Sequence, residues 1–215
     1  MMDAPERLPE RDAAIEATLP NVPFDGWTKR ALKAGIRSAG MPDYEADLLF
    51  PLGTVDMIAT FCDLTDRRME EAAQAIPEKR LTARVRAVIA LRLEQNRPHK
   101  EAIRRALAIL ALPQNARASA AILARTTDAI WHAAGDRSAD FSWYTKRAIL
   151  AGVYSATVLF WLRDTSENDE ATLSFLDRRL AGVGRIGRLR KRVEGLAERL
   201  PRPRLPKARL PFAGG

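Results

Sequence analysis

An apolar stripe with alternating steps of three and four residues runs through the segment from Val55 to Ile76. These steps repeat with the 3.6-residue period of an α-helix, so one face of a long helix is apolar and packs inward. No segment of the sequence shows the strict apolar and polar alternation of a half-buried strand. The stripe therefore predicts an all-α fold. Its members are Val55, Ile58, Cys62, Thr65, Met69, Ala72 and Ile76.

Proline, glycine and capping residues divide the rest of the chain into further helices. Thr54 is expected to cap the striped helix and Pro77 to end it. Asp140 is expected to cap a long helix, and either Ser166 or Asn168 the helix after it. The expected helices span about residues 6–19, 27–39, 43–50, 54–76, 82–96, 98–111, 115–134, 140–163 and 166–181.

Three short helices before a long one resemble the DNA-binding end of TetR-type repressors, in which a helix-turn-helix precedes a long connecting helix. The third short helix here carries Asp43, Glu45 and Asp47 and has no Lys or Arg. These carboxylates would face phosphates in the major groove and repel them. We therefore expect a degenerate helix-turn-helix, and no nucleic-acid partner.

The basic charge is concentrated at the end of the chain. Between Arg178 and Arg209 there are 12 Lys or Arg and two acidic residues, a net charge of +10, while the rest of the chain carries −2 of the total of +8. This asymmetry predicts a polyanionic partner, such as an anionic membrane surface. We expect three parts: residues 6–52, a helix-turn-helix-like part; 53–184, a helical lipid-binding and dimerisation part; and 185–215, a basic amphipathic helix with a proline-rich tail.

Common catalytic and metal-binding patterns are missing from the sequence. Cys62 is the single cysteine, and with only His99 and His132 a multi-thiolate or histidine-rich metal site is excluded. Asp128 and His132 lie one helical turn apart, and we expect a structural hydrogen bond there rather than a metal site. A G-x-G-x-x-G match follows a helix and not a strand, so we expect a flexible joint and not a nucleotide site. We predict no enzyme, no metal and no cofactor; the glycines are Gly182, Gly184 and Gly187.

The segment from Ala148 to Leu162 contains no charged residue. A helix with no polar face is buried on most sides or lines an apolar cavity. Small residues recur there every four positions, which permits close helix packing, as in a core or dimer, or leaves space for an aliphatic ligand. Periodicity alone favours packing over the ligand. The small residues are Ala148, Gly152 and Ala156.

Trp143 and Tyr144 stand at the start of this helix among polar and charged residues. Aromatic side chains with arginine nearby are typical of a partner surface. Half-buried aromatics that staple the start of a helix give the same pattern. The residues alone do not separate these two alternatives.

Five segments are specific enough to indicate a family. They are TLPNVPFDGW from residue 18, LLFPLGTVDMI from 48, ALPQNA from 111, DAIWHAAGD from 128 and DFSWYTKRAILAGVYSATVLFWL from 140. Over about residues 7–185 they resemble the ubiquinone-biosynthesis accessory family founded by the ninth yeast Coq protein. The resemblance implies a TetR-like all-α homodimer that binds isoprenoid lipids, contacts the membrane and presents intermediates to the demethoxyubiquinone hydroxylase.

The resemblance also implies roles for particular residues. Lipid contact maps to Arg147, which would meet a polar or phosphate headgroup, and we expect Gly152, Ala156 and Phe160 to line the lipid site. A partner-binding patch maps to Asp140, Trp143 and Tyr144. Membrane binding is expected from the amphipathic segment with Ile186, Leu189, Arg190, Val193 and Leu196.

The amino end and the overall charge of the chain lead to two further expectations, on localisation and on an alternative function. The amino end shows no targeting peptide, so we expect a bacterial-like cytoplasmic protein that associates peripherally with the inner membrane. The alternative function is a TetR-type ligand-responsive regulator. The basic composition and the helix-turn-helix shape favour the regulator, and the acidic third helix opposes it.

Overall fold

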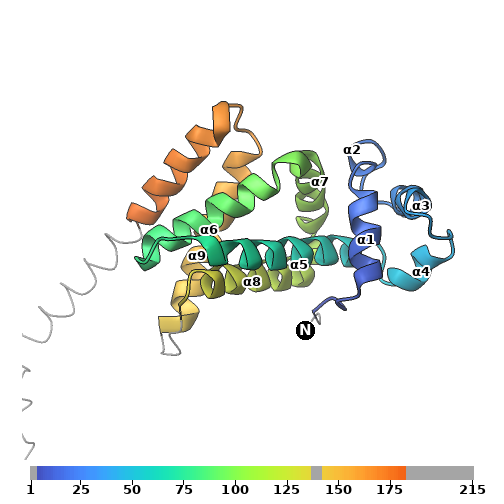
Figure 1. Cartoon of the computed structure of the whole chain (residues 1–215), viewed down its shortest axis with the longest axis horizontal. Coiled ribbons are helices and arrows are strands. Elements are labelled where there is room, and N and C mark those ends of the chain that lie inside the picture. The colour runs from blue at the N-terminus through green and yellow to red at the C-terminus, as the bar shows by residue number, and fades with distance from the viewer. Residues whose placement is uncertain (1–3, 137–141, 183–215) are drawn as a thin grey trace, which may run out of the picture. The chain divides into compact units, whose positions relative to one another are not determined.

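The computed structural model describes residues 4–136 and 142–182, and all regular structure in these ranges is helical. The predicted all-α class is therefore confirmed (Figure 1). The α-helices are α1 (Pro9–Thr18), α2 (Val22–Asp25), α3 (Lys29–Ser38), α4 (Glu45–Leu49), α5 (Thr54–Ala72), α6 (Leu81–Gln95), α7 (Lys100–Leu110), α8 (Ala116–Ala133) and α9 (Ser142–Trp161), followed by helical residues 170–182.

The long helix α5 organises the packing. It lies along α8, and it also contacts α1, α6 and α7 (Figure 1). The stripe of the sequence faces this packing, with Ile58 and Met69 fully buried. Burying an Ile or Met side chain contributes about 1.5–3 kcal/mol. The core continues from α5 into the short N-terminal helices through Ile15, Val22, Trp27, Leu32, Ile36 and Phe50.

The N-terminal helices pack closely because the residues at their contacts are small. A Cβ atom at Gly35 on α3 would lie 2.7 Å from the carbonyl group of Ala17, so only glycine allows this approach of α3 to α1. Trp27 fixes the other side, since its indole N–H donates to the carbonyl of Ala102 on α7 at 2.8 Å. Helix α3 begins at Thr28, whose hydroxyl accepts from the backbone N–H of Ala31 at 3.2 Å.

Buried and half-buried ion pairs join α1 to α5. The Arg11 guanidinium donates to Asp56 at 2.6 Å and to the hydroxyl of Thr60 at 2.8 Å, and all three side chains are buried. Arg11 also donates to the carbonyl of Leu49 and lies over the ring of Phe50. The contacts of Arg11 therefore hold α1, the end of α4 and α5 together.

Some helix ends differ from those that the sequence predicts. Gly53, with φ at +71°, precedes α5, and Thr54 is its first helical residue. The Thr54 hydroxyl does not cap α5; it donates instead to the carbonyl of Trp27 at 2.8 Å. Pro98 lies in a 3-10 turn over 97–99 that precedes α7, and α2 occupies a stretch predicted to be a turn. Each difference is local and leaves the order of the long helices unchanged.

A 3-10 turn over residues 167–169 precedes the helix over residues 170–182. Ser166, one of the two residues expected to cap this helix, stands before the turn, and its hydroxyl accepts from the backbone N–H of Ala171 at 3.0 Å. Asp164 accepts from the backbone N–H of Thr172 at 2.8 Å. Desolvation by itself would raise the pKa of Asp164, but the hydrogen bonds that it accepts from Thr172 and Ser166 lower this pKa. They satisfy amide groups that the first turn of a helix leaves without partners.

Within the described residues, no single helix is both long and apolar enough to cross a membrane. Residues 97–110 and 113–133 meet the length and composition test only as a pair, and the pair is bent by 95°.

Arg11 provides a test of the contact between α1 and α5. Arg11→Met should lower the free energy of unfolding by about 3–5 kcal/mol, because Asp56 would remain buried without its charged partner. Arg7→Met is the matched control, since Arg7 is largely exposed and its partner Asp63 also pairs with Arg67; its effect should stay below about 1 kcal/mol. Urea unfolding measures both variants. Equal effects would show that the Arg11 contact is no stronger than a surface ion pair.

Candidate binding cavity

A cavity of about 300 Å³ lies among α5, α6, α7, α8 and α9. Its volume is at the lower end of the range of small-molecule sites. Most of its lining is aliphatic or aromatic, and two of the lining residues, Ala111 and Leu159, are exposed. The lining residues are Phe61, Cys62, Thr65, Arg92, Leu93, Asn96, Ile103, Ala106, Leu107, Leu110, Ala111, Ser119, Ile122, Leu123, Thr126, Tyr154, Ser155, Val158, Leu159 and Trp161.

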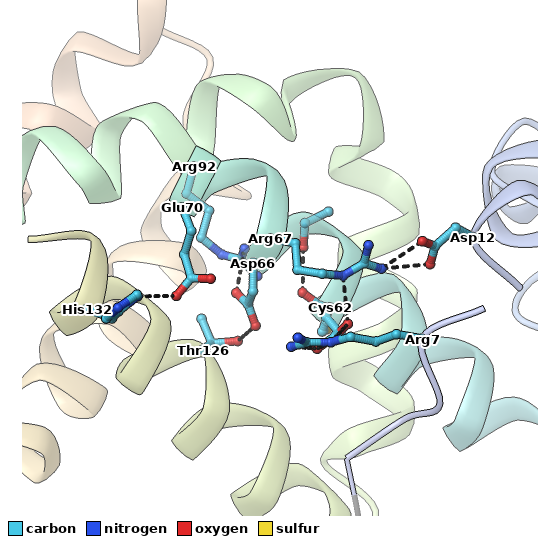
Figure 2. A network of polar contacts seen from close by, with 11 residues as sticks. Arg7, Asp12, Cys62, Asp66, Arg67, Glu70, Arg92, Thr126 and His132 are labelled. Carbon is cyan, nitrogen blue, oxygen red and sulfur yellow. Dashed lines mark hydrogen bonds and ion pairs between the residues drawn. The ribbon is translucent and has the colours of Figure 1, made fainter. Parts of the chain in front are cut away.

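One wall of the cavity is polar. Arg92 on α6 forms an ion pair with Asp66 on α5 at 2.7 Å, and its Nε donates to the hydroxyl of Tyr154 on α9 at 2.8 Å. The hydroxyl of Thr126 on α8 donates to the second oxygen of Asp66 at 2.9 Å (Figure 2). We call these four residues the buried charge cluster. It joins four helices, and three of its members, Arg92, Thr126 and Tyr154, line the cavity.

Burial perturbs the ionisable groups of this wall. Desolvation raises the pKa of Asp66 to about 6, although Arg92 and the Thr126 hydrogen bond act in the opposite direction. Burial by itself would lower the pKa of Arg92, but the attraction to Asp66 outweighs it and the pKa of Arg92 is raised. Desolvation also raises the pKa of Tyr154, and it raises that of the Cys62 thiol to about 12. The thiol is therefore protonated at neutral pH and is not a nucleophile.

A second polar network lies beside the cluster, along the outer side of α5. Asp63 accepts from Arg67 at 2.9 Å and from Arg7 at 2.8 Å, and Arg67 also donates to Asp12 (Figure 2). None of these residues lines the cavity. Their contacts join the N-terminal helix to α5, so we assign this network to the fold.

The four residues predicted to contact lipid lie on α9 but outside the cavity lining. Arg147 pairs with Asp128 on α8. Gly152 is exposed, with nothing within 4 Å of the position that a Cβ would take, and Ala156 is half-buried. Phe160 stacks on Phe175 with 4.6 Å between ring centroids. The cavity is lined by other residues of the same helix, and lipid contact by these four stays a prediction.

The predicted partner and membrane surfaces are described only in part. Tyr144 is 75% exposed. Asp140 and the side chain of Trp143 lie outside the described residues. The predicted membrane-binding residues also lie outside them, namely Ile186, Leu189, Arg190, Val193 and Leu196.

The structure describes most of the residues whose pattern could have suggested a metal or nucleotide site. His132 and Asp128 take separate partners: the Nδ1 of His132 lies 3.1 Å from Glu70, and Asp128 pairs with Arg147. In residues 4–136 and 142–182, no group of three or more His, Cys, Asp or Glu side chains is placed to hold a metal ion. Of the three glycines, Gly182 ends the described part of the last helix, and Gly184 and Gly187 lie outside it.

The buried charge cluster was not predicted, although the sequence holds a signal for it. Val85, Val88 and Ile89 mark the inward face of α6, and Arg92 continues the same spacing. Asp66 likewise stands between the stripe positions Cys62 and Met69. A charged residue at a stripe position indicates a buried partner, because an isolated buried charge is strongly destabilising.

Comparison with known proteins shows which family the chain resembles. The COQ9 family model matches residues 116–187, which include α8 and α9. A relative from Schizosaccharomyces pombe named ubiquinone biosynthesis protein coq9, mitochondrial, is 37% identical over 83% of this chain and 72% of its own length. The chain belongs to the COQ9 family. The family resemblance expected from the sequence is therefore confirmed.

Two other relatives bear the same kind of name. The ubiquinone biosynthesis protein COQ9, mitochondrial, of Rattus norvegicus is 36% identical over 86% of this chain, and that of Homo sapiens is 34% identical over 92%. The chain spans 62% and 64% of the length of these two relatives.

The fold has a solved counterpart. A TetR transcriptional regulator from Nitrosomonas europaea superposes with a TM-score of 0.65 over 81% of this chain and 97% of its own. The two sequences are 21% identical, so the likeness concerns the fold alone. The predicted TetR-like fold is confirmed.

The localisation predicted from the sequence is wrong. We expected a bacterial-like cytoplasmic protein at the inner membrane, whereas these COQ9 relatives are named as mitochondrial. The prediction relied on the composition of the first residues of the given sequence. Because the chain matches only part of its relatives' length, the composition of these residues does not indicate where the protein is located.

The pKa of Asp66 predicts a pH dependence of stability. Its folded value of about 6 lies above the ordinary value of 3.8, so the folded state binds more protons between these values. The contribution of this group to the free energy of unfolding should therefore fall by about 2 kcal/mol as the pH rises from 4 to 6. Asp66→Asn carries no titrating group at this position and should lack this decline. Urea unfolding from pH 4 to 7 compares the two, and parallel profiles would contradict the assignment.

Proposed function

We propose that this protein is a non-enzymatic, lipid-binding accessory protein of ubiquinone biosynthesis. It binds isoprenoid or quinone intermediates in the cavity among α5–α9 and presents them to the demethoxyubiquinone hydroxylase. The observation that carries the proposal is the cavity itself, in which aliphatic side chains from five helices surround about 300 Å³. Membership of a family whose relatives are named for ubiquinone biosynthesis indicates which lipids to expect.

The lining suits an isoprenoid chain energetically. Ile103, Leu107, Leu110 and Leu123 present branched aliphatic groups, which match the branched units of a prenyl chain. Each methylene group moved from water into such surroundings contributes about 0.8 kcal/mol. About ten such groups, the size of two prenyl units, would contribute about 8 kcal/mol, which equals the free energy of micromolar binding before the entropic cost of association is subtracted.

Other parts of the proposal concern the surfaces of α8 and α9. Exposed small and apolar residues on both helices, among them Ala120, Ala124, Ala148 and Gly152, would suit a homodimer.

Arg147, beside Asp128 near the start of α9, would contact a polar or phosphate headgroup. Membrane contact by residues 185–200 stays a prediction from sequence.

A TetR-type regulator is the alternative function, and the charges of α4 oppose it. Two acidic residues on α4, Glu45 and Asp47, would face phosphate if this helix entered the major groove. The fold likeness to a regulator supports only the architecture. We therefore favour the lipid-binding function.

Filling the cavity tests the proposed function. Ser155→Trp places a bulky ring in the cavity and should reduce the lipid that remains bound through purification at least tenfold. Ser174→Trp is the matched control, because Ser174 is exposed and lies outside the cavity lining. Mass spectrometry of lipids extracted from the folded proteins measures the difference. If Ser155→Trp carries as much lipid as the control, the cavity is not the lipid site.

The exposed aromatic at the start of α9 tests the partner surface. Tyr144→Ala should melt within a few degrees of the parent and lose the hydroxylase in a pull-down, because anchor aromatics contribute about 2 kcal/mol or more to binding. Tyr44→Ala is the control, since Tyr44 is 67% exposed and adjoins α4 in the N-terminal part. Equal capture of the hydroxylase by the two variants would remove Tyr144 from the partner surface.

A further inference from the structure

The cavity has two chemically different ends. One end of the cavity is polar. It is formed by Arg92 on α6 and by Asn96, the residue after α6, which are both buried, together with Tyr154. Leu159 is 58% exposed and Ala111 is also exposed, so the cavity opens to solvent beside them. The polar groups are thus deep, and the opening is apolar. An amphipathic ligand matches this arrangement when its polar group enters first.

The Tyr154 hydroxyl is ready to donate a hydrogen bond. Its oxygen accepts from Nε of Arg92 at 2.8 Å, and no described residue accepts its proton. A buried hydroxyl usually has a partner for its proton. Because Arg92 is cationic, its bond also strengthens Tyr154 as a donor. An oxygen atom of a bound ligand in the cavity would complete this chain of hydrogen bonds.

The charges of the polar wall determine which kind of ligand oxygen can bind beside Tyr154. Asp66 neutralises Arg92 at 2.7 Å, and Thr126 occupies the other carboxylate oxygen. Arg92 is the one Lys or Arg among the described lining residues, and Asp66 already neutralises it, so a phosphate or diphosphate group would lack a charged partner in the lining, and burying such a charge is costly. A neutral carbonyl or hydroxyl oxygen adds no charge. The wall therefore favours a neutral oxygen-bearing group.

The volume limits what enters. An engineered cavity of about 150 Å³ accommodates benzene, so a cavity of about 300 Å³ holds a substituted ring and little more. A long prenyl chain does not fit beside the ring. Its first unit would lie against the aliphatic lining, and the rest would leave through the opening and cover the exposed side chain of Leu159.

We propose that Tyr154 orients a prenylated ring bound in the cavity: a neutral oxygen atom of the ring accepts a hydrogen bond from the Tyr154 hydroxyl, and the prenyl chain leaves past Leu159. This inference rests on the proposed function and adds a specificity-determining residue, Tyr154, and an orientation. The buried charge cluster positions the Tyr154 hydroxyl. The ring is shielded from solvent for as long as it stays in this orientation.

Binding measurements on Tyr154→Phe test the orientation. The probes are a ubiquinone with two isoprene units, the prenyl hydrocarbon of equal chain length, and farnesyl diphosphate. Quinone binding is followed by quenching of tryptophan fluorescence, to which Trp161 in the lining contributes, and the other two probes by competition. Tyr44→Phe, which removes an exposed hydroxyl far along the chain, is the matched control. Melting temperatures establish that each variant is folded.

The parent should bind the quinone at least tenfold more tightly than farnesyl diphosphate. Tyr154→Phe should weaken quinone binding about 3- to 10-fold, the loss expected for one hydrogen bond, and leave hydrocarbon binding unchanged. Tyr44→Phe should change neither. A loss of the same size for quinone and hydrocarbon would show that Tyr154 acts only through shape and would overturn the proposal.

Two other results would also overturn it. If the quinone and hydrocarbon bind the parent while Tyr154→Phe changes neither, or if the diphosphate binds as tightly as the quinone, the orientation is wrong and the proposed lipid-binding function stands. If neither the quinone nor the hydrocarbon binds the parent, the lipid-binding function fails, and this inference fails with it.

Discussion

The ion pair between Arg92 and Asp66 is the interaction on which the arrangement of the long helices depends. It joins α5 to α6, and through Thr126 and Tyr154 it reaches α8 and α9. Moving either charge out of water alone would cost several kcal/mol, so each of the four helices must keep its place for the cluster to stay paired. Apolar packing tolerates small shifts between helices, whereas this cluster defines one arrangement.

The same cluster explains why a cavity persists at the centre of the helices. Side chains that collapsed into the space would have to displace Arg92 or Tyr154 from their hydrogen bonds. Lys100 adds a second constraint at the Trp161 side, since its ammonium lies 4.8 Å from that ring and pairs with Asp169 at 2.9 Å. Polar contacts thus hold apart helices that would otherwise close on one another, and the space between them is available to a ligand.

The helices could be predicted from the sequence, whereas the residues that line the cavity could not, and the difference has a physical reason. The stripe on α5 has a clear phase, so its buried face, with Ile58 and Met69, follows from the spacing. The segment 148–162 is apolar on all sides, and a helix without a polar face has no phase that shows which side meets a neighbour. The stripe of small residues predicts lipid contact at Gly152, whereas the residues of α9 that line the cavity include Tyr154 and Val158. Which residues line the cavity depends on how α9 packs against α8 and α6, and the periodicity of its sequence does not show this packing.

The N-terminal helices owe their TetR-like shape to contacts among themselves and with α5. Arg11 holds α1 against α5 through Asp56, and Gly35 permits the close contact of α3 with α1, so the shape is fixed by its own packing. The cations of α3 that could meet phosphate are partly engaged, because Lys29 pairs with Asp47 and Arg37 with Asp43. Recognition of a polyanion depends on exposed positive charge that helix packing does not require. The packing can therefore persist while the surface charge changes, and a TetR-like architecture by itself does not indicate a DNA-binding protein.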